Sequence, residues 1–182
     1  LNQDVNTTYN GIVTGHLALV KNGAGSITLS QSNSFTGGTT VNDGSLILSN
    51  ANAIARGDLT VNGGATTGGK VNLNNLNVAI NALNGSAGAV SGIIANDSTV
   101  NATRTLTVGT NHGGGVFAAA IVDNTGGTSI GKVALTKIGT GSLTLAGDNT
   151  FTGATTITNG TLIADYASAT PLTATPISLR GG

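Results

Sequence analysis

Hydrophobic and polar residues alternate along short stretches of the chain, and this period of two is typical of β-strands with one buried face. Residues 26–30 and 45–49 show it clearly, with serine or threonine beside the aliphatic side chains. Such stretches recur throughout the chain between corners rich in glycine and asparagine. The same rhythm appears at Leu59/Val61, Val71/Leu73, Val78/Ile80, Leu106/Val108, Val133/Leu135, Leu143/Leu145 and Ile177/Leu179. The pattern predicts an all-β fold with many short strands.

A duplicated segment organises the chain. Residues 19–51 and 135–167 align without a gap, and 17 of the 33 positions are identical. Shared low complexity cannot explain the pairing of Lys21 with Lys137 or of Phe35 with Phe151, because both residue types are rare in this chain. We therefore interpret the two segments as copies of one structural repeat.

Two β architectures fit these observations. An antiparallel sandwich joins strands of similar length by hairpin turns, whereas a parallel β-helix, or β-solenoid, stacks successive coils. Very short strands, few charges and few aromatic residues for a sandwich core favour the β-helix. We also expect stacked asparagine amides along the coils, with Asn72, Asn74, Asn75 and Asn77 as candidates. At about 20 residues per coil, the chain predicts a single-stranded parallel β-helix of roughly nine coils.

Composition narrows the possible functions. Charged residues make up 8% of the chain and the formal net charge is zero, so we expect no partner among nucleic acids or anionic membranes. Cysteine is absent, which excludes disulfides and cysteine-ligated metals. The longest apolar run, Val116 to Val122, is far shorter than the roughly 20 residues that cross a bilayer. We expect no membrane insertion by this segment.

The duplicated segment resembles a known repeat. It reads Lys-x-Gly-x-Gly-Ser-(Leu/Ile)-Thr-Leu, then Asn-(Ser/Thr)-Phe-Thr-Gly-x-Thr-Thr-(Val/Ile), then Gly-(Ser/Thr)-Leu-Ile. This pattern is similar to the autotransporter-associated β-strand repeat, also called the passenger-associated transport repeat. The residues that carry the resemblance in the first copy are Lys21, Gly23, Gly25, Ser26, Ile27, Thr28, Leu29, Asn33, Phe35, Thr36, Gly37, Thr39, Thr40, Val41, Gly44, Leu46 and Ile47, and the second copy matches from Lys137 to Ile163.

The resemblance implies a right-handed parallel β-helix in a large bacterial protein that is secreted or exposed at the cell surface after export across the outer membrane. In that family the repeat is associated with export and folding of the passenger rather than with a reaction. We therefore expect a structural stalk or spacer, as in an autotransporter passenger, an adhesin or an extracellular filament. We expect no enzyme activity.

The acidic side chains are scattered along the sequence. All seven are aspartates, and no two lie within ten residues of each other: Asp4, Asp43, Asp58, Asp97, Asp123, Asp148 and Asp165. Several adjoin asparagine, as turn residues do. We predict no catalytic residue. The alternative is a carbohydrate-active β-helix enzyme or a carbohydrate-binding adhesin, and the enzyme would need Asp43, Asp58 or Asp148 to share a groove with a second carboxylate, Lys70 or Arg104.

One tripeptide is a candidate for partner binding. Arg56-Gly57-Asp58 is an integrin-type sequence, although Gly57-Asp58 before the strand-like residues 59–61 is also a natural corner. Adhesion through it requires both charged side chains to reach a partner from an exposed loop. His16 is expected on a strand face and His112 in a solvated loop. We expect no metal site and no cofactor.

Neither end of the sequence has the features of a natural, capped terminus. We expect residues 1–182 to form one continuous β-helix segment of a longer chain, without capping helices at residues 1–5 or 177–182. Open β-helix ends expose unpaired backbone groups. The expected partners are therefore neighbouring coils of the parent chain or end-to-end copies of this segment, with a host or matrix surface as a further partner.

Overall fold

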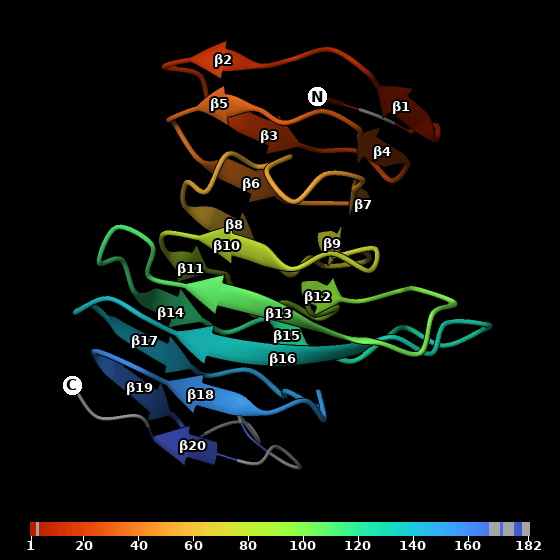
Figure 1. Ribbon diagram of the computed structural model, residues 1–182. Helices are drawn as coiled ribbons and strands as arrows, with labels where there is room; N and C mark the ends of the chain where they lie inside the picture. The colour runs from red at the N-terminus through yellow and green to blue at the C-terminus, as the bar shows by residue number, and fades with distance from the viewer. Residues whose placement is uncertain (3, 168–171, 173–176, 180–182) are drawn as a thin grey trace.

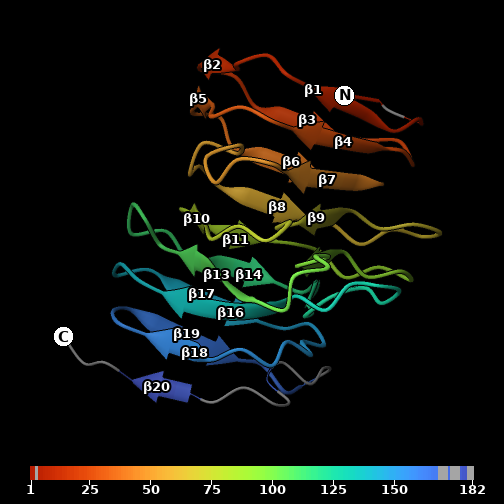
Figure 2. The same ribbon diagram turned by 45° about the vertical axis from the view of Figure 1, so that its right-hand side comes forward.

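The chain forms a stack of parallel β-strands. The computed structural model describes residues 1–182 except residues 3, 168–171, 173–176 and 180–182. Every element of regular structure in the described residues is a β-strand, and all pairings between them are parallel. Figures 1 and 2 show successive turns of the chain lying one below another from the N-terminal to the C-terminal end. Parallel pairing confirms the stacked arrangement and not the antiparallel sandwich.

The strands of the described residues fall into five hydrogen-bonded sheets. The first sheet holds, in spatial order, β1 (Thr7–Tyr9), β4 (Ser26–Leu29), β7 (Ser45–Leu48), β9 (Lys70–Asn72), β12 (Ile93–Ala95) and β15 (Ala120–Ile121). The second holds β10 (Val78–Ile80), β13 (Thr103–Val108), β16 (Lys132–Lys137), β18 (Thr155–Ile157) and β20 (Ile177–Leu179). The third holds β3 (Leu19–Lys21), β6 (Thr39–Val41), β8 (Leu59–Val61) and β11 (Leu83–Asn84). The remaining two are β14 (Gly115–Phe117) with β17 (Ser142–Leu145) and β19 (Thr161–Ala164), and β2 (Thr14–Gly15) with β5 (Ser34–Phe35).

The core is built from inward-facing residues that stack in register. Down the first sheet, Ile27 lies over Leu46, Leu46 over Val71, and the column continues through Ile94 to Ile121. Each of these side chains is at most 2% exposed. Burying one aliphatic side chain contributes about 1.5–3 kcal/mol. The period of two therefore predicted correctly which face of these strands is buried.

The length of a coil is not constant. In the first sheet Ser26 pairs with Ser45, whereas in the second sheet Thr103 pairs with Lys132, so the second of these coils contains many more residues. Loops account for the difference: the connection between β15 and β16 lies within the longer coil, and Figure 2 shows it extending beyond the sheets. The prediction of roughly nine coils assumed a uniform coil length. The longest sheet in the described residues holds six strands, so the number of coils stays a prediction.

An asparagine ladder runs along the stack, but not where the sequence suggested. Asn42 donates from Nδ2 to Oδ1 of Asn22 (2.8 Å), and Asn62 donates in the same way to Asn42 (2.8 Å). Asn22 in turn donates to Asn2 (3.1 Å). The four candidates of residues 72–77 lie within one coil and form other hydrogen bonds. Asn72 Oδ1 accepts from the backbone N–H of Asn74 and Asp97, and Asn74 Nδ2 donates to the Leu48 carbonyl. Asn75 Oδ1 accepts from Arg104 Nε, and Asn77 Oδ1 accepts from the Thr105 N–H. An amide ladder needs residues one coil apart, so these four cannot stack on one another.

Thr39 is an exception in the core. Its side chain points inward between Leu19 and Leu59, is 2% exposed, and leaves Oγ1 without a hydrogen-bond partner. A buried hydroxyl without a partner is costly. We predict that Thr39→Val raises the free energy of unfolding by about 1 kcal/mol in urea titrations. Thr40→Val, on the outward face of the same strand, should change it little, and a destabilised Thr39→Val variant would contradict this account.

Candidate functional site

A groove on the outer face of the first sheet is lined mainly by polar side chains. It has a volume of about 320 Å³. We call it the face groove and define it by its lining residues, which are Asn6, Ala24, Ser26, Ser45, Ile47, Lys70, Asn72 and Asp97. Its floor follows from strand alternation: Ser26, Ser45 and Lys70 are in-register neighbours whose side chains face outward from β4, β7 and β9. Small polar residues at successive outward positions leave room above the sheet.

An ion pair closes one side of the face groove. The Lys70 ammonium pairs with the Asp97 carboxylate and also donates to Thr125 Oγ1 at 2.9 Å. Thr125 donates to the same carboxylate from its backbone N–H (2.7 Å) and from its hydroxyl (2.9 Å). Burial alone would raise the pKa of Asp97, but the hydrogen bonds from Lys70 and Thr125 and the Lys70 charge outweigh it and lower the pKa below 3.8. Asp97 is therefore ionised at neutral pH.

The lowered pKa predicts how this ion pair affects stability. The unfolded chain binds the Asp97 proton more tightly, so the stabilisation is present above pH 3.8 and is lost as the pH falls through the lower folded pKa. We predict that Asp97→Asn lowers the free energy of unfolding by about 1–2 kcal/mol at neutral pH and by little at about pH 2.5. Urea titrations at both pH values test this, with Asp165→Asn as the control. A cost that does not depend on pH would contradict the assignment.

A second, adjoining hollow brings together two residues that the enzyme hypothesis required. This rim hollow, of about 250 Å³, shares Ala24, Ser45 and Lys70 with the face groove, and Asp43 also lines it. Asp43 and Lys70 thus share a concave surface. However, Asp43 Oδ1 accepts a hydrogen bond from the Gly44 N–H at 2.6 Å, as a turn residue does. Asp97, the second carboxylate nearby, is ion-paired and ionised and so is no proton donor for glycoside hydrolysis.

The other titratable residues considered in the sequence form hydrogen bonds within turns or between coils. Asp123 Oδ1 accepts from the backbone N–H of Val133 (2.9 Å) and Thr152 (3.0 Å). His16 Nδ1 lies 3.0 Å from Thr36 Oγ1, and His112 Nδ1 accepts from the Thr140 N–H at 3.4 Å. Arg104 donates to Asn75. Across the described residues, no group of three or more histidine, aspartate or glutamate side chains is placed to hold a metal ion, and no helix is long and apolar enough to cross a membrane.

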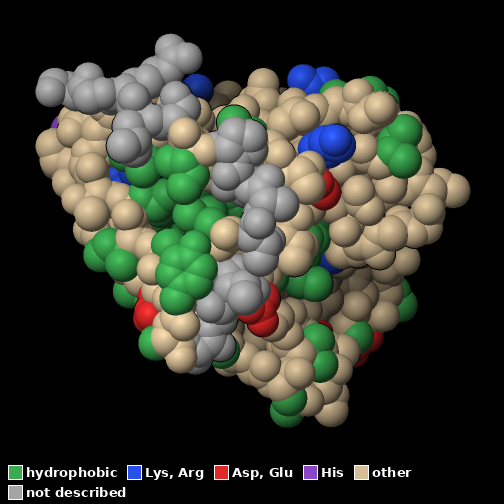
Figure 3. All heavy atoms as spheres, turned by 90° about the horizontal axis from the view of Figure 1, so that it is seen from below, with side chains coloured by type: hydrophobic (Ala, Val, Ile, Leu, Met, Phe, Trp, Pro, Cys, Tyr) green, Lys and Arg blue, Asp and Glu red, His purple; other side chains and the backbone are tan. Residues whose placement is uncertain are grey.

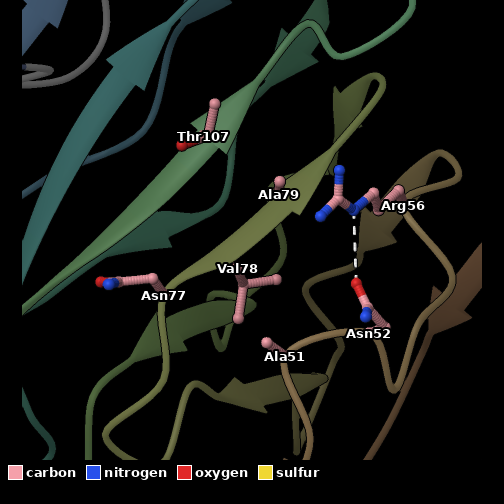
Figure 4. A pocket seen from close by; sticks show the side chains of 7 residues that line it. All are labelled: Ala51, Asn52, Arg56, Asn77, Val78, Ala79 and Thr107. Atoms are coloured by element: carbon pink, nitrogen blue, oxygen red, sulfur yellow. Dashed lines mark hydrogen bonds between the residues drawn. The ribbon is translucent and has the colours of Figure 1, made fainter. Parts of the chain in front are cut away.

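The Arg56-Gly57-Asp58 tripeptide lies in a turn before β8, and its two charged groups bond to the protein itself. Figure 4 shows Arg56 beside a hollow of about 210 Å³ that Val78, Ala79 and Thr107 also line. Its Nε donates to Asn52 Oδ1 at 3.3 Å. Asp58 Oδ1 accepts from Asn81 Nδ2 at 2.7 Å and from the Ala82 N–H at 3.2 Å. Adhesion through the tripeptide stays a prediction. Binding of an integrin ectodomain to the chain tests it, and Asp58→Ala should abolish that binding.

Two buried lysines, one in each copy of the duplicated segment, form sites that the sequence pattern did not lead us to expect. Lys21 and Lys137 are both 0% exposed. Lys21 Nζ donates to the carbonyls of Asn22 (2.9 Å), Gly23 (2.6 Å) and, one coil on, Asp43 (3.2 Å). Lys137 Nζ donates to the carbonyls of Ile138 (2.5 Å) and Gly139 (3.1 Å). We call each arrangement a lysine cage.

Burial lowers the pKa of both lysines, and for Lys21 the charges of Asp43 and Asp4 oppose the shift. The carbonyls of each cage replace the water that the ammonium loses. In the neighbouring coil the position in register with Lys21 is Val41, an ordinary core residue. Each lysine therefore takes a core position and uses its charge to hold a turn together.

Strand alternation could have indicated the cages. It places Lys21 on the same face as Leu19, and glycine follows at the second and fourth positions after the lysine. An inward lysine before a glycine-rich turn can only be tolerated if turn carbonyls surround its ammonium. From the sequence, the pairing of the two lysines indicated only that the segment is duplicated.

These features define the class of protein: a repeat protein of stacked parallel β-coils, in which each copy of the duplicated segment carries one buried, carbonyl-bound lysine. Comparison with known families agrees with the resemblance. The chain contains the passenger-associated-transport-repeat, with matches at residues 19–48, 43–67 and 135–164. The first and third matches coincide with the duplicated segment. The second, at 43–67, had not been recognised from the sequence.

One curated relative is the adhesin BmaC autotransporter of Brucella suis biovar 1 (strain 1330). The identity is 33% over 156 residues, which is 84% of this chain. The chain spans only 4% of the length of that relative. No solved structure matches the chain.

Proposed function

We propose that the chain is a structural segment, a stalk or spacer within a secreted or surface-exposed bacterial protein of the autotransporter passenger type. The observation that carries the proposal is the unbroken parallel pairing of the first sheet from β1 to β15, with aliphatic side chains stacked in register below it. Such a stack can be lengthened coil by coil without changing its cross-section. The repeat matches and the adhesin relative support the surface setting.

The finer architecture belongs to the same proposal. Residues 1–182 act as one continuous, single-stranded parallel β-helix, and the sense of its coils is right-handed. Connections between parallel strands are right-handed in about 98% of cases, which supports this sense. The stalk needs no catalysis, since rigidity and length are its only requirements, and the paired, ionised Asp97 supports a non-enzymatic role.

The experiment that tests the stalk is a series of fusions that carry one, two and three tandem copies of the chain. A rigid spacer predicts that the maximum dimension measured by small-angle X-ray scattering rises by an equal increment with each copy. A dimension that grows roughly as the square root of copy number, as in flexibly joined beads, would refute the proposal. Protease treatment of intact cells that produce the parent protein tests the surface setting, and full protection of this segment would count against it.

We further propose that each end of the stack pairs with another coil, either of the parent chain or of a second copy. Apolar side chains are exposed on the first coil: Leu1, Val5, Tyr9, Ile12 and Leu17. Tyr9, 42% exposed, lies in register over Leu29, which is 2% exposed. Figure 3, which looks onto the last coils, shows apolar side chains gathered beside the residues drawn in grey. A further coil would bury both surfaces.

End-to-end stacking predicts self-association of the isolated chain. Light scattering coupled to size-exclusion chromatography should show a mass that increases with protein concentration. Val5→Lys combined with Ile12→Lys should hold the chain monomeric, because it places charge on the exposed first coil. Val116→Lys, at a comparably exposed position on the side of the stack, is the matched control. A wild-type chain that stays monomeric at all concentrations would contradict end stacking.

A further inference from the structure

The face groove offers hydrogen-bonding groups that the fold itself does not use. Asn72 is 8% exposed, and its Oδ1 accepts from the backbone N–H of Asn74 (2.8 Å) and Asp97 (3.0 Å). These two bonds fix the orientation of the amide. Nδ2 has no partner among the described residues, and the side chain lines the face groove. A nearly buried amide whose two N–H groups are unused can donate both to a bound acceptor.

Further hydrogen-bonding groups without a partner lie along the floor of the face groove. The hydroxyls of Ser26 and Ser45 form no hydrogen bond within the described residues, and Lys70 keeps one of its three N–H groups after bonding Asp97 and Thr125. Ser26, Ser45 and Lys70 follow one another in register on adjacent strands. Adjacent strands are about 4.8 Å apart, so the groups repeat at a spacing close to the length of one sugar ring in an extended chain.

The charge of the face groove limits what it can bind. Its one cation, Lys70, and its one anion, Asp97, neutralise each other. An anionic ligand would therefore gain little, and a peptide would find no free sheet edge on this outward face. A neutral, hydroxyl-rich ligand can use every group described, accepting from Asn72 and Lys70 and exchanging hydrogen bonds with the serines, while Ile47 offers apolar contact to a ring face. We propose that the face groove binds a neutral saccharide.

Titration with uncharged linear tetrasaccharides tests this site. We would add cellotetraose, mannotetraose and tetra-N-acetylchitotetraose to the full chain and follow backbone and side-chain amide signals by nuclear magnetic resonance. At least one probe should bind with a dissociation constant on the order of 1 mM and shift the Asn72 side-chain signals. Tetragalacturonate, which carries a carboxylate on each sugar, should bind more weakly than the neutral probes.

Two variants test whether the saccharide binds in the face groove or elsewhere on the surface. Asn72→Asp keeps the acceptor oxygen for Asn74 and Asp97 but removes the two donors, and Ser45→Gln fills the groove without changing Asn72. Each should weaken binding at least about fivefold, while Asn84→Asp, an amide on the third sheet, should leave it unchanged. Absence of binding by all three neutral probes, wild-type binding by both groove variants, or preference for tetragalacturonate would overturn the proposal. None of these results bears on the stalk, which the tandem fusions test separately.

Discussion

Replacing Lys21 by methionine is expected to lower the free energy of unfolding by about 3 kcal/mol. Methionine fills much of the same space, but it leaves the carbonyls of Asn22, Gly23 and Asp43 without the ammonium that they bind. Buried carbonyl groups that lose a charged partner account for most of this cost. Because Asp43 belongs to the next coil, the loss should also weaken the contact between two coils.

Lys132→Met is the matched control for this experiment. Lys132 is an exposed lysine at the start of β16, the strand that ends in the buried Lys137. Its replacement should change the free energy of unfolding by less than about 0.5 kcal/mol. Lys137→Met should resemble Lys21→Met, since both lysines bind turn carbonyls. Equal effects of Lys21→Met and Lys132→Met in urea titrations would show that the cage contributes nothing.

Replacing Gly44 by alanine is expected to cost more than about 3 kcal/mol or to prevent folding. Gly44 has a φ of +63°, which disfavours any side chain, and it faces the lysine cage. A Cβ there would collide with the carbonyl oxygens of Gly23 and Gly25 and lie 2.8 Å from Lys21 Nζ. Gly160 repeats the arrangement in the second copy, at a φ of +75° and with Lys137 Nζ at 2.9 Å. Backbone oxygens cannot move aside as a flexible side chain would.

Gly127→Ala measures the cost of the backbone conformation without the collision. Gly127 has a similar φ of +70°, but a Cβ there would meet no atom within 4 Å. Its replacement should cost only the conformational penalty, about 1 kcal/mol. Thermal or urea unfolding of the two variants gives the difference directly. If Gly44→Ala is no worse than Gly127→Ala, the turn is not packed against the cage as described.

The sequence could predict the strands and their buried faces because both depend on local alternation. Ile27, Leu29, Leu46 and Leu48 all face the core as expected. It could not predict which coil a residue contacts once loops vary, because the coil that separates Thr103 from Lys132 is much longer than the coil that separates two paired residues near the N-terminal end. The asparagine ladder was misplaced for a different reason: the four candidates at residues 72–77 lie within one coil, whereas the ladder joins asparagines that are one coil apart.

The candidate sites were harder to predict than the strands. The face groove joins Asn6, Ser45 and Asp97, which are far apart in sequence and meet only through the register of successive coils. The sequence did indicate that Lys70 could matter beside Asp43, and these residues do share the rim hollow. It did not indicate that Asp97 pairs with Lys70, because the two residues lie on different coils. They meet because β9, which begins at Lys70, pairs with β12, the strand just before Asp97.

Parallel, coil-on-coil pairing is the central claim, and cysteine cross-linking across β13 and β16 tests it most directly. The chain has no native cysteine, so every introduced pair reports one distance. In parallel register Thr103 lies beside Lys132 and Thr107 beside Thr136. A short methanethiosulfonate linker should therefore join both of these double-cysteine variants efficiently, and join the crossed pairs, Thr103 with Thr136 and Thr107 with Lys132, poorly. Efficient linking of the crossed pairs instead would show that the strands run antiparallel and would contradict the account.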